Sequence, residues 1–361
     1  MKLSQLHIQT LRNLNNIHLQ PGMGLNCLIG ANGSGKTSIL EAIYLLGLGR
    51  SFRAPQLKQV IQRGTEELVV FAEMIDLGSD FIHKLGFSRD VSGKTRMKLN
   101  GEAVTTIAEL AQLLPILLLY DESYALFRDS PSARRKWLDW GMFHVEPQFF
   151  PLWRKLQRVL QQRNALLKQG ASDIDIKGWD FQLIEIGEAI HGLRETFIEK
   201  WQLAMSPILQ ALFNKDDLVL TYTSGWDLQR GLAEILSSSL YKDRAMGYTT
   251  SGPQRADINL SIEGIPAQHT LSLGQQKLMV TGIILSQAIL VSTLAAKAPL
   301  LLIDDLPAEL DGKARKKIAK IIHELNAQIF LTGIDEHTLE PFLNTSNAPN
   351  VFHVEHGKIK T

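Results

Sequence analysis

The pattern of apolar and polar positions divides the chain into strand-rich ends and a helical middle. Short apolar runs over residues 3–8, 17–20 and 25–29 predict three strands near the start. Residues 66–105 show the alternation of antiparallel strands, and Asn100-Gly101 is typical of a two-residue hairpin turn. These patterns predict a strand-rich lobe.

Helical periodicity begins soon after the third predicted strand. One helical face carries Ile39, Ala42, Ile43 and Leu46. Gly47 and Gly49 are predicted to end that helix, because glycine commonly stops a helix at its carboxyl end.

Long helical patterns rich in Leu, Gln and Arg run from residue 131 to about residue 244, with turns at 170–172 and 224–225. The strand pattern returns after residue 246. We therefore predict an α/β fold with a discontinuous head, formed by residues 1–115 and 246–361, that includes an antiparallel β lobe. Residues 116–245 are predicted to form an inserted, mainly helical arm domain.

Composition narrows the setting more than the function. A single cysteine, Cys27, excludes an intrachain disulfide and suits a reducing, cytoplasmic compartment. The uncharged stretch 278–296 has the length of a membrane span, but five Ser, Thr and Gln residues interrupt it, so we expect a buried helix and no membrane partner. The net charge of +1 leaves a nucleic-acid partner open.

Residues 30–37, Gly-Ala-Asn-Gly-Ser-Gly-Lys-Thr, fit the phosphate-loop pattern G-x-x-x-x-G-K-[ST] and follow a predicted strand. Backbone amides of such a loop surround phosphate oxygens, Lys36 reaches the β- and γ-phosphates, and the Thr37 hydroxyl holds Mg²⁺. We expect a nucleoside triphosphate to bind here. The expected contacts are Gly30, Ala31, Asn32, Gly33, Ser34, Gly35, Lys36, Thr37 and Ser38.

A second phosphate-site motif is the apolar run 300–303 followed by two acids. Asp304, at the end of the predicted strand, is placed to hold Mg²⁺ or its bound water. Asp305 is placed to orient the attacking water. This layout is that of a Walker B motif.

Residues 271–277, Leu-Ser-Leu-Gly-Gln-Gln-Lys, resemble the signature motif of the ATP-binding-cassette (ABC) superfamily. Ser272, Gly274 and Gln275 stand at a predicted helix start, which favours anions. Residues 309–311 match the D-loop, and Thr332 or Gly333 occupies the usual switch-histidine position, so no histidine sensor is expected. The resemblance implies an ATP-dependent head-to-tail dimer in which Ser272 acts on the partner's nucleotide, alongside Lys36, Asp304 and Asp305 as catalytic residues.

Four further segments resemble the RecF family: 11–13, 49–53, 130–139 and 251–257. With the motifs above, the resemblance runs from residue 1 to about residue 335. By this resemblance Arg12 and Asn13 lie near the nucleotide base and α-phosphate. The chain departs from the family at Gln254, where a histidine is usual, and matches it loosely at 119–122.

The resemblance implies a DNA-binding ATPase of recombinational repair and replication-fork maintenance. It would clamp DNA at gaps or single-strand/double-strand junctions, assist RecA loading with RecO and RecR, and release DNA through slow, DNA-stimulated hydrolysis, in the nucleoid-associated cytoplasm. Candidate basic DNA contacts, which suit salt-sensitive phosphate binding, are Arg50, Arg53, Arg134, Arg135, Lys136, Arg154, Lys155, Arg158, Arg163, Lys313, Arg315, Lys316, Lys317 and Lys320.

Other classes of protein share parts of this pattern. A transport ATPase subunit needs a docking surface for membrane helices, and a structural chromosome ATPase of the SMC type needs hundreds of residues of coiled coil between its motifs. An ABC ATPase that acts on a protein partner, and a binding module with a degenerate nucleotide site, also stay open. Nucleotide-dependent DNA binding separates these alternatives.

Overall fold

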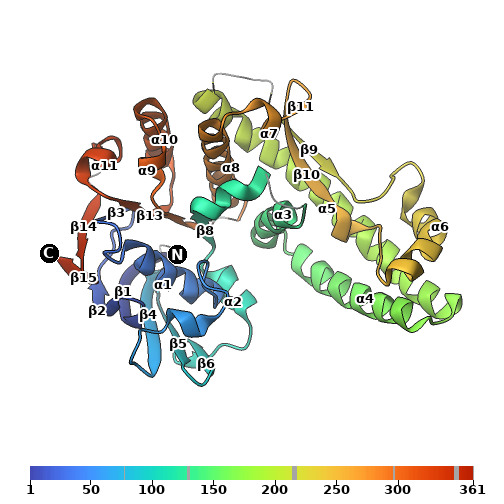
Figure 1. Cartoon of the computed structure of the whole chain (residues 1–361), viewed down its shortest axis with the longest axis horizontal. Helices are drawn as coiled ribbons and strands as arrows, with labels where there is room; N and C mark the ends of the chain where they lie inside the picture. The colour runs from blue at the N-terminus through green and yellow to red at the C-terminus, as the bar shows by residue number, and fades with distance from the viewer. Residues whose placement is uncertain (77, 128–130, 214–217, 296, 345–348, 361) are drawn as a thin grey trace. The chain divides into compact units, whose positions relative to one another are not determined.

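The computed structural model describes residues 1–76, 78–127, 131–213, 218–295, 297–344 and 349–360 (Figure 1). The chain separates into two compact units. The sheet unit consists of Met1–Tyr124 and Lys277–Thr361, and the helical unit consists of Ala125–Gln276. Each unit is described by itself.

A mostly parallel six-stranded sheet forms the base of the sheet unit. Its strand order is β15 (Lys358–Lys360), β14 (Asn350–Glu355), β3 (Leu25–Ile29), β13 (Gln328–Gly333), β12 (Leu300–Ile303) and β8 (Ile116–Leu119). All neighbours run parallel except β14 and β15, which form a hairpin. The carboxyl ends of β3, β12 and β13 therefore lie at one edge, where open α/β sheets bind ligands.

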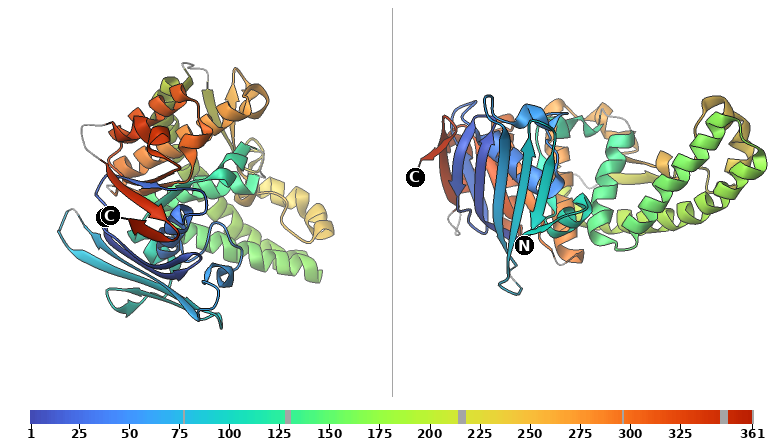
Figure 2. Two further views of the ribbon diagram at one scale, coloured as in Figure 1. Left: turned by 60° about the vertical axis from the view of Figure 1, so that its left-hand side comes forward. Right: turned by 90° about the horizontal axis from the view of Figure 1, so that it is seen from below.

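A second, antiparallel sheet belongs to the same unit. Its order is β2 (Leu14–Leu19), β1 (Lys2–Leu11), β4 (Glu67–Ile75), β5 (Ile82–Asp90), β6 (Thr95–Leu99) and β7 (Glu102–Ala103). The predicted hairpin turn is confirmed, because Asn100 and Gly101 have φ angles of 54° and 90° and join β6 to β7. Figure 2 shows the strands of this sheet side by side.

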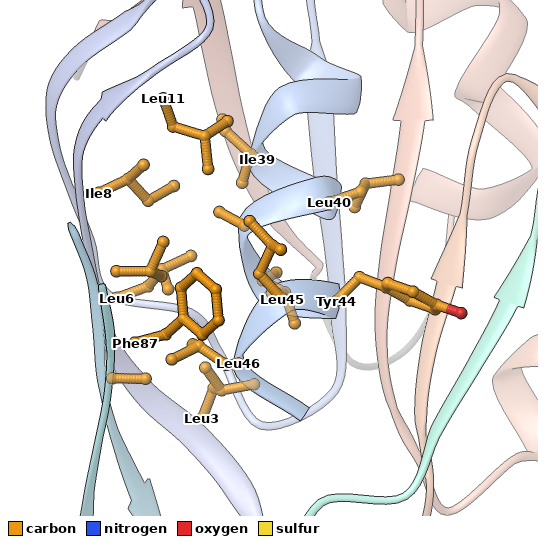
Figure 3. Close-up of a cluster of buried hydrophobic side chains, with 14 of the residues drawn as sticks. Leu3, Leu6, Ile8, Leu11, Ile39, Leu40, Tyr44, Leu45, Leu46 and Phe87 are labelled. Atoms are coloured by element: carbon orange, nitrogen blue, oxygen red, sulfur yellow. The ribbon is translucent and has the colours of Figure 1, made fainter. Parts of the chain in front are cut away.

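Helix α1 (Lys36–Leu48) contributes to the hydrophobic core on more than one face. Figure 3 shows Ile39, Leu45 and Leu46 on the side of β1, while Leu40 and Tyr44 point the other way. The prediction of a single apolar face was therefore incomplete, since a helix covered all round is apolar all round. Gly49 ends the helix in a left-handed conformation, whereas Gly47 lies inside it.

The other helices of the sheet unit are short, apart from α8. They are η1 (Leu57–Val60), α2 (Ile107–Leu113), α9 (Leu306–Glu309), α10 (Gly312–Glu324) and α11 (Glu336–Leu343). Two segments cross the unit boundary: η2 (Asp121–Phe127) and α8 (Leu273–Leu294). By length and composition alone α8 could cross a membrane, yet 67% of its most apolar window is buried within the protein. Residue 296 of the predicted stretch lies outside the described residues.

The helical unit contains α3 (Pro131–Val145), α4 (Phe149–Gln169), α5 (Asp173–Phe213), α6 (Gly231–Met246), η3 (Pro253–Arg255) and α7 (Ala267–Thr270). It also holds a small sheet in the order β11 (Ile265–Pro266), β10 (Asp257–Ile262) and β9 (Leu218–Thr223). The sequence analysis missed β9. Because β9 pairs with β10, residues 246–276 belong with the helices, and the unit boundaries differ from the predicted 115/116 and 245/246.

Candidate nucleotide-binding site

The predicted phosphate loop joins the end of β3 to the start of α1. Gly33 and Gly35 have φ angles of 78° and 120°, which glycine adopts readily. The Lys36 ammonium donates hydrogen bonds to the carbonyls of Gly30 (2.7 Å) and Ala31 (3.1 Å). The Ser34 hydroxyl oxygen is buried and has no hydrogen-bond partner in the described part of the chain. The loop thus combines a positive charge, a free hydroxyl and a helix N-terminus, which is the chemistry of a phosphate site.

Asn13, in the turn between β1 and β2, holds the phosphate loop through its side chain. Its Nδ2 donates to the Gly33 carbonyl (3.1 Å), and its Oδ1 accepts from the Ser38 hydroxyl (3.1 Å). Asn13 therefore lies against the loop, where the resemblance to the family placed it. These two bonds make it a brace for the loop backbone.

Arg12 is anchored by an acid that the sequence analysis overlooked. Its Nε and Nη2 both contact Glu41 of α1, with Nη2 2.8 Å from Oε1. The Glu41 side chain is fully buried, also accepts from the Ser51 hydroxyl, and raises the pKa of Arg12 through its hydrogen bond. Glu41 thus ties the β1–β2 turn and the Ser51 loop to the phosphate-loop helix. An acid inside an otherwise apolar helix was the available signal.

The two acids after β12 lie beside the phosphate loop. The Thr37 hydroxyl is 3.0 Å from Oδ1 of Asp304. Burial raises the pKa of Asp304, and the neighbouring charge of Asp305 raises it further. The Thr37 and Asp304 oxygens are ligands that suit Mg²⁺. No group of three or more His, Cys, Asp or Glu that could hold a metal occurs among the described residues, so Mg²⁺ here would take other ligands from phosphate and water.

Thr332, at the end of β13, joins the two acids. Its hydroxyl oxygen accepts from the Asp305 N–H (2.7 Å), and its one proton can go to Asp304 (3.0 Å) or Asp305 (3.2 Å). Asp305 itself has a φ of 51°, an unusual conformation for a residue other than glycine. The sequence analysis placed Thr332 at the switch position without a role. The structure shows that it fixes both acids.

The signature-like segment begins α8 with a reciprocal cap. The Gln275 side chain accepts from the Ser272 N–H (2.9 Å), and the Ser272 hydroxyl accepts from the Gln275 N–H (3.4 Å). Ser272, Leu273, Gly274 and Gln275 are all exposed, and Leu273 retains 62% of its accessible surface. The positive end of the helix is therefore presented to solvent within the single chain.

The structure removes several residues from the predicted set of DNA contacts. The Arg163 side chain is fully buried and binds Asp180 (2.6 Å), Asp243 (2.7 Å) and Thr249 (2.9 Å). Arg134 forms a two-pronged ion pair with Asp257, both bonds 2.8 Å long. Arg135 donates to the Ala256 carbonyl (2.7 Å). These arginines hold the helical unit together, and we withdraw them as DNA contacts. Residue 130 of the segment 130–139 lies outside the described residues.

Other predicted basic contacts are accessible. In the sheet unit the exposed side chains are Arg50, Arg53, Lys313, Lys316 and Lys320, and in the helical unit they are Lys136, Arg154, Lys155 and Arg158. Arg315 and Lys317 are half-buried. The charge of Arg53 acts on Asp304 and lowers its pKa slightly against the opposing effects of burial. Lys316 and Lys320 line a groove of ≈ 580 Å³ between α10 and α11.

The fold and the site define an ATPase of the ABC type. A phosphate loop follows one strand of a parallel sheet, an acid pair follows a second strand, and a third strand between them supplies Thr332. An antiparallel sheet and a helical unit complete the arrangement. The predicted α/β fold class is confirmed.

Comparison with known proteins identifies the family. The model of the RecF/RecN/SMC N terminal domain matches residues 2–360. The "DNA replication and repair protein RecF" of Stutzerimonas stutzeri (strain A1501) is 42% identical over 360 residues, which are 99% of this chain and 97% of that protein. The protein of the same name from Pseudomonas aeruginosa (strain LESB58) is 39% identical over the same shares. The chain therefore belongs to the RecF family.

Solved structures agree with this assignment. The structure of "the recombination mediator protein RecF-ATPrS in RecFOR pathway" superimposes with a TM-score of 0.85 at 26% identity, covering 99% of this chain and 97% of that one. An Smc head bound to the C-winged helix domain of ScpA has a TM-score of 0.63 at 15% identity, with 100% of this chain and 96% of that one covered, and shows the shared fold. Membership of this ATPase family implies ATP binding and hydrolysis.

Proposed function

We propose that this protein is a DNA replication and repair ATPase whose nucleotide state sets its affinity for DNA. The observation that carries the proposal is the cluster in which Thr37, Asp304 and Asp305 meet around Thr332 beside the phosphate loop. These residues come from three distant segments, and structural packing alone does not require two carboxylates at one buried site. The names of the relatives support the link to replication and repair.

Each side chain has a role in this proposal. Lys36 moves from the loop carbonyls to the β- and γ-phosphates, Thr37 and Asp304 hold Mg²⁺, and Asp305 orients the attacking water. Phosphoryl transfer depends mainly on positioning and charge stabilisation, which a set of fixed groups supplies. Residues 30–38 contribute backbone and hydroxyl contacts to the phosphates. Arg12 and Asn13 shape the loop, and the resemblance places them near the base and α-phosphate.

Dimerisation is the second part of the proposal. The exposed helix start formed by Ser272, Gly274 and Gln275 suits the γ-phosphate bound by a second copy of the chain. Two copies arranged head to tail would enclose two nucleotides, and Ser272 would then be catalytic in trans. Hydrolysis would be slow in the monomer and would separate the dimer once ATP is spent.

DNA is the third part. The accessible cations Arg154, Lys155 and Arg158 on α4, and Lys313, Lys316 and Lys320 on α10, suit sequence-independent contacts with DNA phosphates. The names and titles of the relatives support a place in the RecFOR pathway, with RecO and RecR as partners and RecA loading as the outcome. The proposed substrate is gapped DNA or a junction, DNA stimulates hydrolysis, and the setting is the nucleoid-associated cytoplasm.

The test is fluorescence-anisotropy binding to a labelled gapped duplex without nucleotide, with ADP and with ATP, at two salt concentrations. Wild type is expected to bind in ATP and to weaken steeply with salt. Lys36→Met is expected to lose the ATP-dependent gain, and Asp305→Asn is expected to stay bound because it cannot complete hydrolysis. Binding that is equal in all nucleotide states would contradict the proposal. ATP binding without DNA binding would favour an ABC ATPase that acts on a protein partner.

A further inference from the structure

The phosphate loop is contacted by a hairpin from much later in the chain. Strand β14 runs parallel to β3, with His353 beside Ile29, the last residue before the loop. A Cβ atom placed on Gly30 would lie 2.2 Å from the Val354 carbonyl oxygen. The two backbones therefore touch where β3 enters the loop, and only glycine fits at position 30.

The turn of this hairpin, His356-Gly357, makes the closest approach. His356 and Gly357 have φ angles of 48° and 73°, typical of a two-residue hairpin turn. The Gly357 N–H donates a hydrogen bond of 2.8 Å to the Ser34 carbonyl. A Cβ atom on Gly357 would lie 2.1 Å from the Asn13 carbonyl oxygen. Gly357 thus packs between the loop and the residue that braces it.

The hydrogen bond to Ser34 fixes the orientation of one loop amide. The Ser34 carbonyl and the Gly35 N–H belong to the same trans peptide plane, so they point in opposite directions. Because the carbonyl is turned toward Gly357, the Gly35 N–H is turned away from the hairpin. Backbone N–H groups of this part of a phosphate loop are the ones that bind phosphate oxygens.

We propose that the His356-Gly357 turn is a positioning element of the nucleotide site, and that Gly357 sets ATP affinity by orienting the Gly35 amide. The inference rests on the proposed nucleotide site. Gly357 touches no nucleotide itself and acts through Ser34 and Asn13. The positive φ of Gly35, 120°, means that its own backbone does not select this orientation strongly, so a fixed neighbour matters.

The chain offers a matched control in the same unit. Gly101 is also the second residue of a left-handed two-residue turn, with a φ of 90°, but a Cβ atom there would have no heavy atom within 4 Å. Gly357→Ala and Gly101→Ala therefore share the backbone cost of alanine at positive φ. Only Gly357→Ala pushes against the phosphate loop.

The experiment titrates each variant with a fluorescent N-methylanthraniloyl ATP and measures ATPase kinetics. Gly357→Ala is expected to weaken nucleotide binding by at least about tenfold, since a bond that orients a donor to a charged group is lost. KM for ATP should rise with kcat little changed, and residues 30–37 should exchange amide hydrogens faster without nucleotide. Gly101→Ala should match wild type in all three measurements.

A second variant covers loss of folding. Asn adopts positive φ more easily than Ala, so Gly357→Asn retains the turn while its Cβ still meets Asn13. Weaker nucleotide binding in a folded Gly357→Asn supports the inference. If wild type binds the nucleotide and the Gly357 variants bind it equally well, the inference is wrong and the proposed function stands. If wild type itself fails to bind, the proposed function fails.

Discussion

The two units bury charged side chains for different purposes. In the sheet unit the buried or half-buried charges Lys36, Glu41 and Asp304 gather around the phosphate loop at the carboxyl ends of the strands. In the helical unit Arg163 and Arg194 are buried just as deeply, but their partners are structural. Burial of a charge therefore does not identify a catalytic site. Its place at a strand edge with oxygen ligands and a phosphate loop does.

The charges of the helical unit hold one segment in place. Arg163 binds the hydroxyl of Thr249, and Arg194 donates to the Pro253 carbonyl (2.7 Å). The Gln254 amide, at the position where the family usually has histidine, donates to the Ser251 carbonyl (2.9 Å). The family-like segment 251–257 is thus anchored to α4 and α5 from within.

The largest expected effect comes from breaking the charges of the helical unit. Arg163→Met leaves Asp180 and Asp243 buried without their cation, which should cost about 3–5 kcal/mol of unfolding free energy. Chemical denaturation followed by circular dichroism measures it. Arg158→Ala, on an exposed part of the same helix, should change stability by less than about 0.5 kcal/mol. Equal stability of Arg163→Met and wild type would show that the buried cluster contributes nothing net.

A smaller change in stability, with a change in binding, is expected for Glu41→Gln. The substitution removes the charge that pairs with Arg12 but keeps the shape, so it should cost about 1–3 kcal/mol. Because Arg12 adjoins Asn13, which braces the loop, nucleotide affinity should also fall, by about threefold to tenfold. Calorimetric titration with ATP measures the affinity. An unchanged affinity would separate Glu41 from the nucleotide site and weaken the contrast between the units.

The smallest effect on stability is expected for Thr332→Val. Valine keeps the volume but leaves the Asp305 N–H without its acceptor, at a cost of about 1 kcal/mol. ATP hydrolysis should fall by more than nucleotide affinity, because the orientation of Asp305 is lost while Lys36 and Thr37 remain. Steady-state kinetics with Thr332→Ser as the rescuing variant provides the measurement. A hydrolysis rate equal to wild type in Thr332→Val would show that Thr332 does not orient Asp305.

Much of the sheet unit followed from the sequence, because its motifs are local. The strand before Gly30, the loop and the acids after β12 each lie within a few consecutive residues. Glu41 and the β14–β15 hairpin were missed, since their importance comes from contacts with distant segments. The helical unit was harder to predict, because β9 is recognised as a strand only through its pairing with β10. Arg163 was misjudged because helical spacing does not show that its face is buried.

The position of β3 within its sheet also has a consequence for biosynthesis. Both parallel neighbours of β3, the strands β13 and β14, are translated after the helical unit. Domains generally fold as units while the ribosome still extends the chain. A nascent chain can thus complete its helical unit while the phosphate loop still lacks the Gly357 contact. Translation that stops before residue 328 would leave a product that displays the start of α8 but cannot assemble the sheet around β3.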